Sequence, residues 1–361
     1  MTEPGLATVS PVFTVNGERA PELARDCVRL DIAEDTTGLR TMRAHLVAVG
    51  GGAPGPQKRM LHLDGSRLDF GRPVRVSLGP DTAQRVVFEG MISALEACYG
   101  DSEPPSVVVS AEDALMRLRM TRRMRTYTRM TDAEIADAIA HEHGLQGRAA
   151  ADGPRYDVVQ QLNQSDLAFL RERARLVQAE LWCEGRDLHF ASRPRRKGTT
   201  LTLVQGNQLL SVRLCADLAH QRSAVVISGY DAVARGVIDE RVTADVIDAE
   251  ITGGRTGARV VERALGASVT YRVREAALTS EEARAWARAE MLRRGRRFVT
   301  AHGVTRGTPD MMVGSRLKLD QVGPPFDGDG YYVTRIRHTF DHETGLRTEF
   351  EAERATVNEA G

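Results

Sequence analysis

The chain has 361 residues, of which 42% are hydrophobic, and its 49 basic side chains balance 49 acidic ones. That length supports two or three domains with cores of their own and excludes a single small module. A net charge of zero provides no overall field for nucleic acid or an anionic membrane, so any basic recognition has to be local. The longest apolar runs are strand-sized, and residues 1–13 lack the regions of a signal peptide, which predicts cytoplasmic synthesis and no membrane insertion.

The first part of the chain alternates short apolar runs with turn residues. After a flexible arm at residues 1–10, we expect strands in VFTV, CVRLDI, MRAHLVAV, VRVSL and VVFEGMI, with a GGGAPGP loop at 50–56 and a last strand at 106–110. Short strands at this spacing are typical of a sandwich or barrel. We therefore predict a first β-barrel domain over residues 11–115.

Helical patterns follow in residues 116–195, which we predict to be a small α/β insert. Thr131-Asp132-Ala133-Glu134 is a capping box, and it predicts a helix near 131–143 that ends before Gly144. Residues 156–164 have the composition of a polar turn. Ser165 is a good N-cap for a second helix near 165–178, and two apolar runs around Gly185 predict a hairpin at 180–190.

A second β-rich region is predicted over residues 196–355, with strands in LTLV, LLSVRLCADL, SAVVISGYD, SRLKLD, YYVTRIRH and RTEFEAER. RPRRKG at 193–198 is expected to be an exposed linker, and GGRTGAR at 253–259 a flexible loop. Thr279-Ser280-Glu281-Glu282 is a second capping box, which predicts a helix near 280–293. Residues 356–361 are expected to be a tail.

Three segments of the first β region have counterparts in the second. GRPVRVSL at 71 matches GSRLKLDQ at 314, VVFEGMISAL at 86 matches YYVTRIRHTF at 331, and SVVVSAED at 106 matches LRTEFEAE at 346. The order is the same in both regions. We hypothesise two related antiparallel β-barrels separated by the α/β insert, within an α+β and mainly β chain.

Several features could carry chemistry, and each has a simpler structural explanation. His141-Glu142-His143 lacks the HExxH spacing that places two histidines on one helix face, so we predict no metal site. The four cysteines stand singly and suggest buried, reduced thiols. Arginine clusters at 117–129, 193–197 and 293–297 are typical of solvated edges or subunit contacts as well as of phosphate binding. We therefore predict no catalytic residues and no cofactor.

Three segments resemble, in sequence and order, the phage late control gene D family: TYTRMTDAEIADAIAHEHGL, then YDVVQQLNQSDLAFLRERARLVQAELWCEGRDLHF, and finally RRFVTAHGVTRGTPDMMVGSRLKLDQVGPPFDGDGYYVTRIRHTF. That family includes the baseplate hub of contractile phage tails, the hub part of VgrG spike proteins in type VI secretion, and hubs of phage-tail-like extracellular injection particles. The resemblance spans residues 70–354 or so, and its most specific piece is NQSDLAFL at 163–170.

The resemblance implies a structural hub without enzymatic activity. It implies a homotrimer of two-barrel chains, whose six similar surfaces adapt a sixfold inner tube above to a threefold spike below, with other baseplate proteins around it and cargo or DNA in the lumen. Because the sequence shows no needle or hydrolase domain after the second β region, we expect a stand-alone hub whose spike is a separate protein, as in a phage, or a truncated relative in an injection particle. The candidate ring-forming residues are Val74, Arg75, Val76, Leu78, Leu317, Lys318 and Leu319.

Two other functions remain open at this point. Some tail hubs are peptidoglycan hydrolases, although this sequence has no GxSxG elbow, HExxH motif or evident carboxylate pair. A nucleic-acid or cargo-contacting channel would use the arginine clusters, and its binding would weaken steeply with salt. The residues do not distinguish a phage from a secretion system or an extracellular injection particle.

Overall fold

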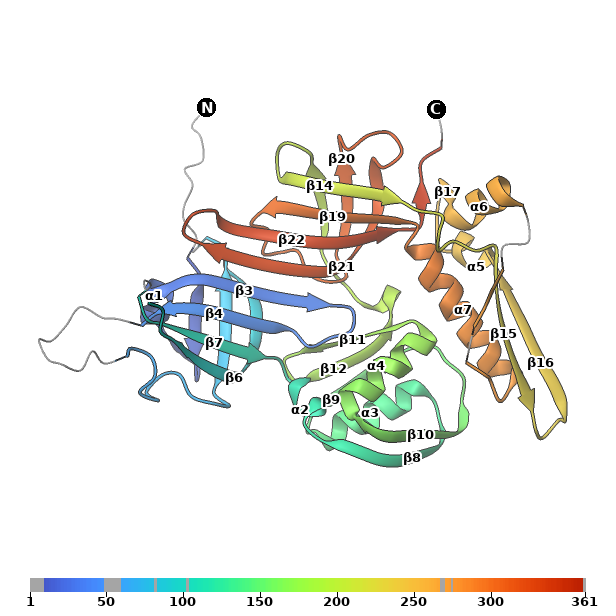
Figure 1. Ribbon diagram of the computed structural model, residues 1–361, viewed down its shortest axis with the longest axis horizontal. Coiled ribbons are helices and arrows are strands. Elements are labelled where there is room, and N and C mark those ends of the chain that lie inside the picture. The colour runs from blue at the N-terminus through green and yellow to red at the C-terminus, as the bar shows by residue number, and fades with distance from the viewer. Residues whose placement is uncertain are drawn as a thin grey trace, which may run out of the picture.

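The computed structural model describes residues 10–48, 60–80, 83–101, 104–266, 270–273 and 275–359. Nearly all of the expected arm at 1–10 and the whole of the GGGAPGP loop lie outside these ranges. The chain forms two β-sheet halves and two α/β inserts (Figure 1). Strands of both halves run side by side in one broad sheet, and the inserts lie along one flank of it.

The first half contains seven strands and one short helix in its described residues. They are β1 (Val12–Val15), β2 (Glu18–Arg19), α1 (Pro21–Asp26), β3 (Cys27–Asp35), β4 (Thr41–Val47), β5 (Pro73–Leu78), β6 (Arg85–Cys98) and β7 (Ser106–Glu112). Their order in the sheet is β3-β4-β7-β6-β5-β1-β2. Alternate residues of these strands are buried, which gives one apolar core between the curved strands.

The second half is built from β13 (Thr200–Val204), β14 (Leu209–Ala216), β19 (Val299–Arg306), β20 (Arg316–Asp320), β21 (Gly328–Asp341) and β22 (Gly345–Arg354). Its strand order is β14-β19-β22-β21-β20-β13. Position by position, this is the order β3-β4-β7-β6-β5-β1 of the first half. The predicted internal repeat is therefore present in the topology.

Two β-bulges recur at equivalent places and fix the alignment of the halves. One lies between Ile92 and Ala94 in β6 and between Val333 and Arg335 in β21. The extra residues, Ser93 and Thr334, each donate a side-chain hydrogen bond to a carbonyl of the next strand, over 3.4 and 3.3 Å. Because bulges re-aim a strand and interrupt its ladder, a shared bulge is a specific sign of common architecture.

The second shared bulge lies between Cys27 and Arg29 in β3 and between Leu209 and Ser211 in β14. The bulges align Ile92 with Val333 (333 − 92 = 241) and Arg29 with Ser211 (211 − 29 = 182). The sequence match had placed Val86 opposite Tyr331, whereas the strand pairing places Gly90 there. The bulges are present in both halves and therefore set the alignment where the sequence identities are too sparse to do so.

Neither half is a closed barrel in the part of the chain that the structure describes, so the two-barrel prediction is not confirmed. Each half is an open, curved part of one continuous sheet, and the first half is joined to the second at β3. The halves also differ in one pairing, because β13 runs parallel to β20 whereas β1 runs antiparallel to β5. The expectation of purely antiparallel units is therefore wrong for β13.

The first insert follows β7 and has its own apolar core. It contains α2 (Met116–Arg119), β8 (Arg122–Met130), α3 (Asp132–Glu142), β9 (Gln146–Ala150), β10 (Tyr156–Ser165), α4 (Asp166–Val177), β11 (Ala179–Glu184) and β12 (Asp187–Ser192). The capping box before α3 is formed, with both Thr131–Glu134 hydrogen bonds present. The Ser165 cap and the hairpin β11–β12 also agree with the sequence. Residues 156–164 are strand β10, paired with β8, and not a polar turn.

The second insert was not anticipated as a separate unit. Between β14 and β19 lie β15 (Ala224–Asp231), β16 (Gly236–Thr243), α5 (Asp245–Asp248), β17 (Arg255–Thr256), α6 (Gly257–Leu265), β18 (Thr270–Arg272) and α7 (Ser280–Arg296), around a further small core. The expected loop at 253–259 instead enters α6, with Thr256 as N-cap. The expected tail begins with β23 (Thr356–Val357), which pairs with β17.

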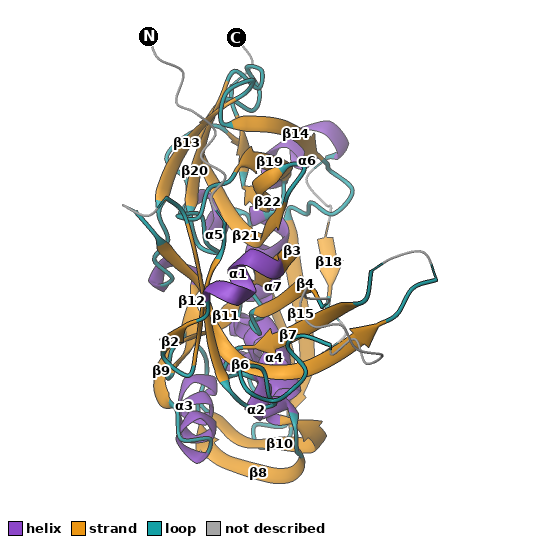
Figure 2. Ribbon diagram, turned by 90° about the vertical axis from the view of Figure 1, so that its left-hand side faces the viewer, coloured by secondary structure: helices purple, strands orange, loops and turns teal. Residues whose placement is uncertain are grey.

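Helix α7 joins the two inserts. Its N-cap Thr279 accepts a hydrogen bond from the Glu282 N–H, while the Glu282 carboxylate accepts from Leu278, one residue earlier than in a complete capping box. Trp286 on α7 donates to the Tyr156 hydroxyl over 3.2 Å. Figure 2 shows the resulting shape, with β13 and β20 of the second half at one end and the pair β8–β10 at the other.

Candidate assembly edges and an arginine-lined cavity

The strands proposed from sequence to form a ring occupy equivalent places, β5 and β20, in the two halves. Their apolar members are at most 3% exposed and belong to the cores of their own halves: Val74, Val76, Leu78, Leu317 and Leu319. Arg75 and Lys318 point outward and pair with Glu89 and Asp320. The structure therefore leaves only these two side chains of the set on the surface, and their role in a ring stays a prediction.

The two halves meet along a single strand junction. The C-terminal part of β21 pairs antiparallel with β3, from Arg335 opposite Asp35 to Asp341 opposite Arg29. Phe340 and Leu30 face each other across this junction on its core side and are 1% and 0% exposed. On the other side of the sheet, the Arg337 guanidinium lies 2.5 Å from the Asp31 carboxylate. Backbone pairing, apolar burial and an ion pair all hold the junction together.

Two edges equivalent to this junction have no partner strand among the described residues. β5 covers β6 only as far as Met91, so that residues 94–98 are open on that side. β14 is the terminal strand beyond β19. Tyr99, just after β6, is 70% exposed, and Leu210 on β14 is 36% exposed. An unpaired edge carrying apolar side chains is a ready template for another chain.

The cysteines divide between the cores and these edges. Cys27 and Cys183 are buried, and burial raises the pKa of the Cys27 thiol to about 12. Cys98 is half-buried and Cys215 is exposed, so the prediction of buried thiols is wrong for these two. Cys98 ends β6 and Cys215 lies on β14, which places both accessible thiols on the open edges.

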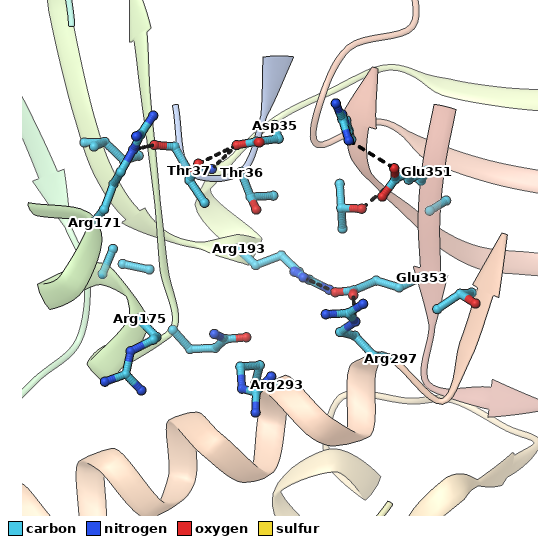
Figure 3. A pocket seen from close by; sticks show the side chains of 18 of the residues that line it. Asp35, Thr36, Thr37, Arg171, Arg175, Arg193, Arg293, Arg297, Glu351 and Glu353 are labelled. Atoms are coloured by element: carbon cyan, nitrogen blue, oxygen red, sulfur yellow. Dashed lines mark hydrogen bonds and ion pairs between the residues drawn. The ribbon is translucent and has the colours of Figure 1, made fainter. Parts of the chain in front are cut away.

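A cavity of about 410 Å³ opens where β3, the first insert and α7 meet. Its walls carry six arginines and three carboxylates: Arg171, Arg175, Arg193, Arg293, Arg297, Arg335, Asp35, Glu351 and Glu353. In Figure 3, the guanidinium groups of Arg193 and Arg297 both point toward the Glu353 carboxylate. Arg171 donates to the carbonyls of Thr37 and Gly38 over 2.9 and 3.0 Å. The cations of this cavity are thus largely engaged in joining the modules.

A buried ionic network lies beneath the cavity. Arg196 is 5% exposed and contacts the carboxylates of Glu34 at 2.5 Å and Glu180 at 3.4 Å. The Tyr332 hydroxyl donates to Glu180 over 2.6 Å, and burial beside this carboxylate raises the pKa of Tyr332 far above its usual value. The expectation of an exposed linker at 193–198 is therefore wrong for two of its residues. Arg193 binds carboxylates of the insert and the second half, and Arg196 binds carboxylates of the first half and the insert.

The remaining arginine clusters are mostly ion-paired. In the first, Arg119 pairs with Glu112, Arg123 with Asp166 and Arg125 with Glu142. In the last, Arg293 and Arg294 pair with Glu290, and Arg296 with Glu250. Such pairing removes much of the free positive charge that a phosphate site needs.

The histidines near residue 141 have a structural explanation. His143 lies 2.8 Å from the Asp166 carboxylate, at the C-cap of α3 and the first turn of α4. In the described ranges, no group of three His, Cys, Asp or Glu side chains is arranged to hold a metal ion. Burial raises the pKa of Asp113 to about 6, but this carboxylate accepts the N–H groups of Arg40 and Leu115 and anchors the insert.

The open edges of β6 and β14 were not identified from sequence, although one signal was available. VVFEGMISALEACYG runs five residues beyond VVFEGMISAL, the segment matched to the second β region, and these five include Tyr99. No helix in the described part of the chain is long and apolar enough to span a membrane.

The fold is shared with several solved structures. A 43 kDa tail protein of prophage MuSo2 from Shewanella oneidensis superimposes with a TM-score of 0.66 at 14% identity, over 96% of this chain and 98% of that one. A tail protein from Neisseria meningitidis gives 0.62 at 14% identity, over 96% of both chains. An Escherichia coli component of the type VI secretion system gives 0.59 at 13% identity, over 97% of this chain and 79% of that one.

Sequence comparison identifies a family directly. No curated protein matches the chain, whereas the family model of the Alg8 N-terminal domain matches residues 15–342. This match does not support the narrower assignment to the late control gene D family, although the solved structures show the fold of tail proteins. The matched segment covers most of the sequence, and the chain therefore belongs to the Alg8 N-terminal domain family.

Proposed function

We propose that this chain is a structural subunit of a contractile tail or secretion apparatus, which assembles as a homotrimer whose six halves form a ring. The observation that carries the proposal is the junction of β21 with β3, together with equivalent open edges on β6 and β14. In the ring, β6 of each subunit pairs with β14 of the next, as β21 pairs with β3 inside the chain.

The shared bulges specify the register of this pairing. Because Arg337 lies opposite Ala33 and Thr339 opposite Asp31 inside the chain, Glu96 comes opposite Cys215, and Cys98 opposite Arg213, between subunits. The contact is heterologous, since two different edges meet, and such contacts close into rings when the rotation between units allows it.

The exposure of the edge residues fits this register. Phe340 is buried against β3, whereas its equivalent Tyr99 is 70% exposed. Leu30 and Ile32 of β3 are fully buried, whereas their equivalents Val212 and Leu214 on β14 are only half-buried. Pairing of β6 with β14 would bury these side chains as the internal junction buries theirs. Removing such apolar surface from water is a general driving force for association.

A ring of six similar halves from three subunits suits an adaptor between a sixfold tube and a threefold spike. The Escherichia coli neighbour has structural similarity to the T4 phage tail proteins gp27 and gp5, and Francisella VgrG is a neighbour solved in complex with PdpA. By analogy, the partners of this chain are a tube protein, a spike protein and other baseplate proteins. Cargo or DNA would pass through the lumen, and the chain itself would have no enzymatic role.

The test is the mass of the purified protein by light scattering, followed by electron microscopy. We expect particles of three chains with threefold symmetry. Leu214→Asp places a charge on the β14 edge and should shift the protein to monomer, whereas the control Tyr230→Asp, at an exposed site on β15 of the second insert, should not. A monomer at all concentrations that binds neither tube nor spike would contradict the proposal.

A further inference from the structure

We infer that the junction between subunits carries the ion pair of the internal junction with its polarity reversed, so that Glu96 of one copy pairs with Arg213 of the next and selects that edge. The inference rests on the proposed ring. It concerns which edges recognise each other, and its partner is a second copy of this chain.

The internal junction supplies the geometry. Arg337 on β21 and Asp31 on β3 are diagonal neighbours across the antiparallel pair, and their side chains meet at 2.5 Å. Through the bulge alignment, the position of Arg337 is occupied in β6 by Glu96, and the position of Asp31 is occupied in β14 by Arg213. In the internal junction β21 carries the cation and β3 the anion. In the proposed junction between subunits β6 carries the anion and β14 the cation.

Both side chains are available for this contact. Glu96 is 57% exposed and also contacts Arg43 at 3.1 Å, much as Asp31 contacts both Arg337 and Arg29. Arg213 is exposed on the outer strand, and its side chain makes no hydrogen bond or ion pair with the residues that the structure describes. The free guanidinium lies where the internal junction holds a carboxylate.

The reversal separates correct from incorrect edge pairing. If β6 met a β3 edge, Glu96 would face Asp31, and if β21 met a β14 edge, Arg337 would face Arg213. Like charges that meet across a strand pair are destabilising, whereas opposite charges stabilise it. Since the backbones of all four edges are alike, the charge pair distinguishes the two kinds of junction.

Charge reversal tests this assignment. Glu96→Arg alone and Arg213→Glu alone each place like charges at every subunit junction. If the repulsion weakens association roughly fivefold at each of the three junctions, the association constant of the trimer falls on the order of a hundredfold. The double variant Glu96→Arg/Arg213→Glu restores opposite charges and should recover the trimer. It should also exclude differently tagged wild-type subunits, because mixed junctions pair like charges.

The control for the first substitution is Glu89→Arg, which removes an exposed glutamate from the part of β6 that β5 already covers. The control for the second is Arg241→Glu on the exposed strand β16. Trimers should persist in both. Failure of the double variant to recover, or its free mixing with wild-type subunits, would overturn the charge assignment while the wild-type trimer still supported the ring. A monomeric wild type would overturn both.

Discussion

Phe340 and Tyr99 occupy equivalent positions in the two halves, yet the first is 1% exposed and the second 70% exposed. The strand order, the bulges and the core positions repeat, but the edge that β21 and β3 bury within the chain is open on β6 and β14. One chain therefore displays both the joined and the unjoined state of the same edge. This difference is the basis of the proposed ring.

The halves differ also in the connection between their first two strands. Residues 36–40 join β3 to β4 as a short turn, whereas the second insert occupies residues 217–298 between β14 and β19. An insertion at a strand end leaves the sheet order intact, because connections lie outside the hydrogen-bonded ladder. The insert then fixes the second half to the first insert through Trp286 and Tyr156.

The largest expected effect is on the free energy of unfolding, which should respond to substitution at the joined edge but not at the open edge. Phe340→Ala should lower the free energy of unfolding by about 3–5 kcal/mol, because it leaves a cavity in a closed core. Tyr99→Ala should change it by less than about 0.5 kcal/mol in the dilute monomer, while weakening the trimer. Urea denaturation measures the first quantity and light scattering the second. If Phe340→Ala and Tyr99→Ala lowered the stability of the monomer equally, the two positions could not be one at a joined edge and one at an open edge.

A second difference between the halves depends on pH. His338 is buried and bonded to Thr348 over 2.9 Å, and burial lowers its pKa to about 4, whereas the equivalent residue of the first half is Ala97. In the unfolded chain the imidazole takes up its proton near pH 6.5, before the folded protein does. Stability is therefore fully present above pH 6.5 and falls by on the order of 3 kcal/mol as the pH drops toward 4.

Denaturation at a series of pH values checks this prediction. His338→Gln should flatten the dependence between pH 6.5 and 4, whereas His342→Gln, at an exposed position, should leave it unchanged. If the slope survived in His338→Gln, another group would have to be responsible.

The smallest expected effect tests the equivalence of the bulges. Ser93→Ala and Thr334→Val each remove one hydroxyl that donates to a neighbouring carbonyl. We expect each to cost about 0.5–1 kcal/mol, the usual net value of such a hydrogen bond, and the two costs to be similar. A loss confined to one half, seen by thermal or chemical denaturation, would argue against equivalent roles.

Local signals were predictable from the sequence, and long-range pairing was not. The Thr131–Glu134 capping box and the Ser165 cap depend on residues three apart, and both formed as expected. Strand β8 was obscured because its inward side carries Arg123 and Arg125, whose charges are met by Asp166 and Glu142 far along the chain. A charged residue can be buried only beside such a partner, and a linear pattern does not reveal one.

The candidate assembly edges were also only partly predictable from the sequence. The repeat located the right strands, but it directed attention to β5 and β20, whose apolar side chains fill the cores of their own halves. The open edges could be identified only from the strand order, because an edge is open when no strand pairs with it in the folded sheet. Arg196 was assigned to a linker for a similar reason, since its carboxylates lie on β3 and β11.

The most direct test of the proposed ring uses the two accessible native thiols. In the register of the internal junction, Cys98 of one subunit and Cys215 of the next are diagonal neighbours on one face, about 7–8 Å apart. A short bis-maleimide should give covalent dimers and trimers joined through peptides that contain these two residues, and Cys98→Ser or Cys215→Ser should abolish them. The absence of a trimer band, or linkage of Cys98 to Cys98, would contradict head-to-tail pairing of β6 with β14.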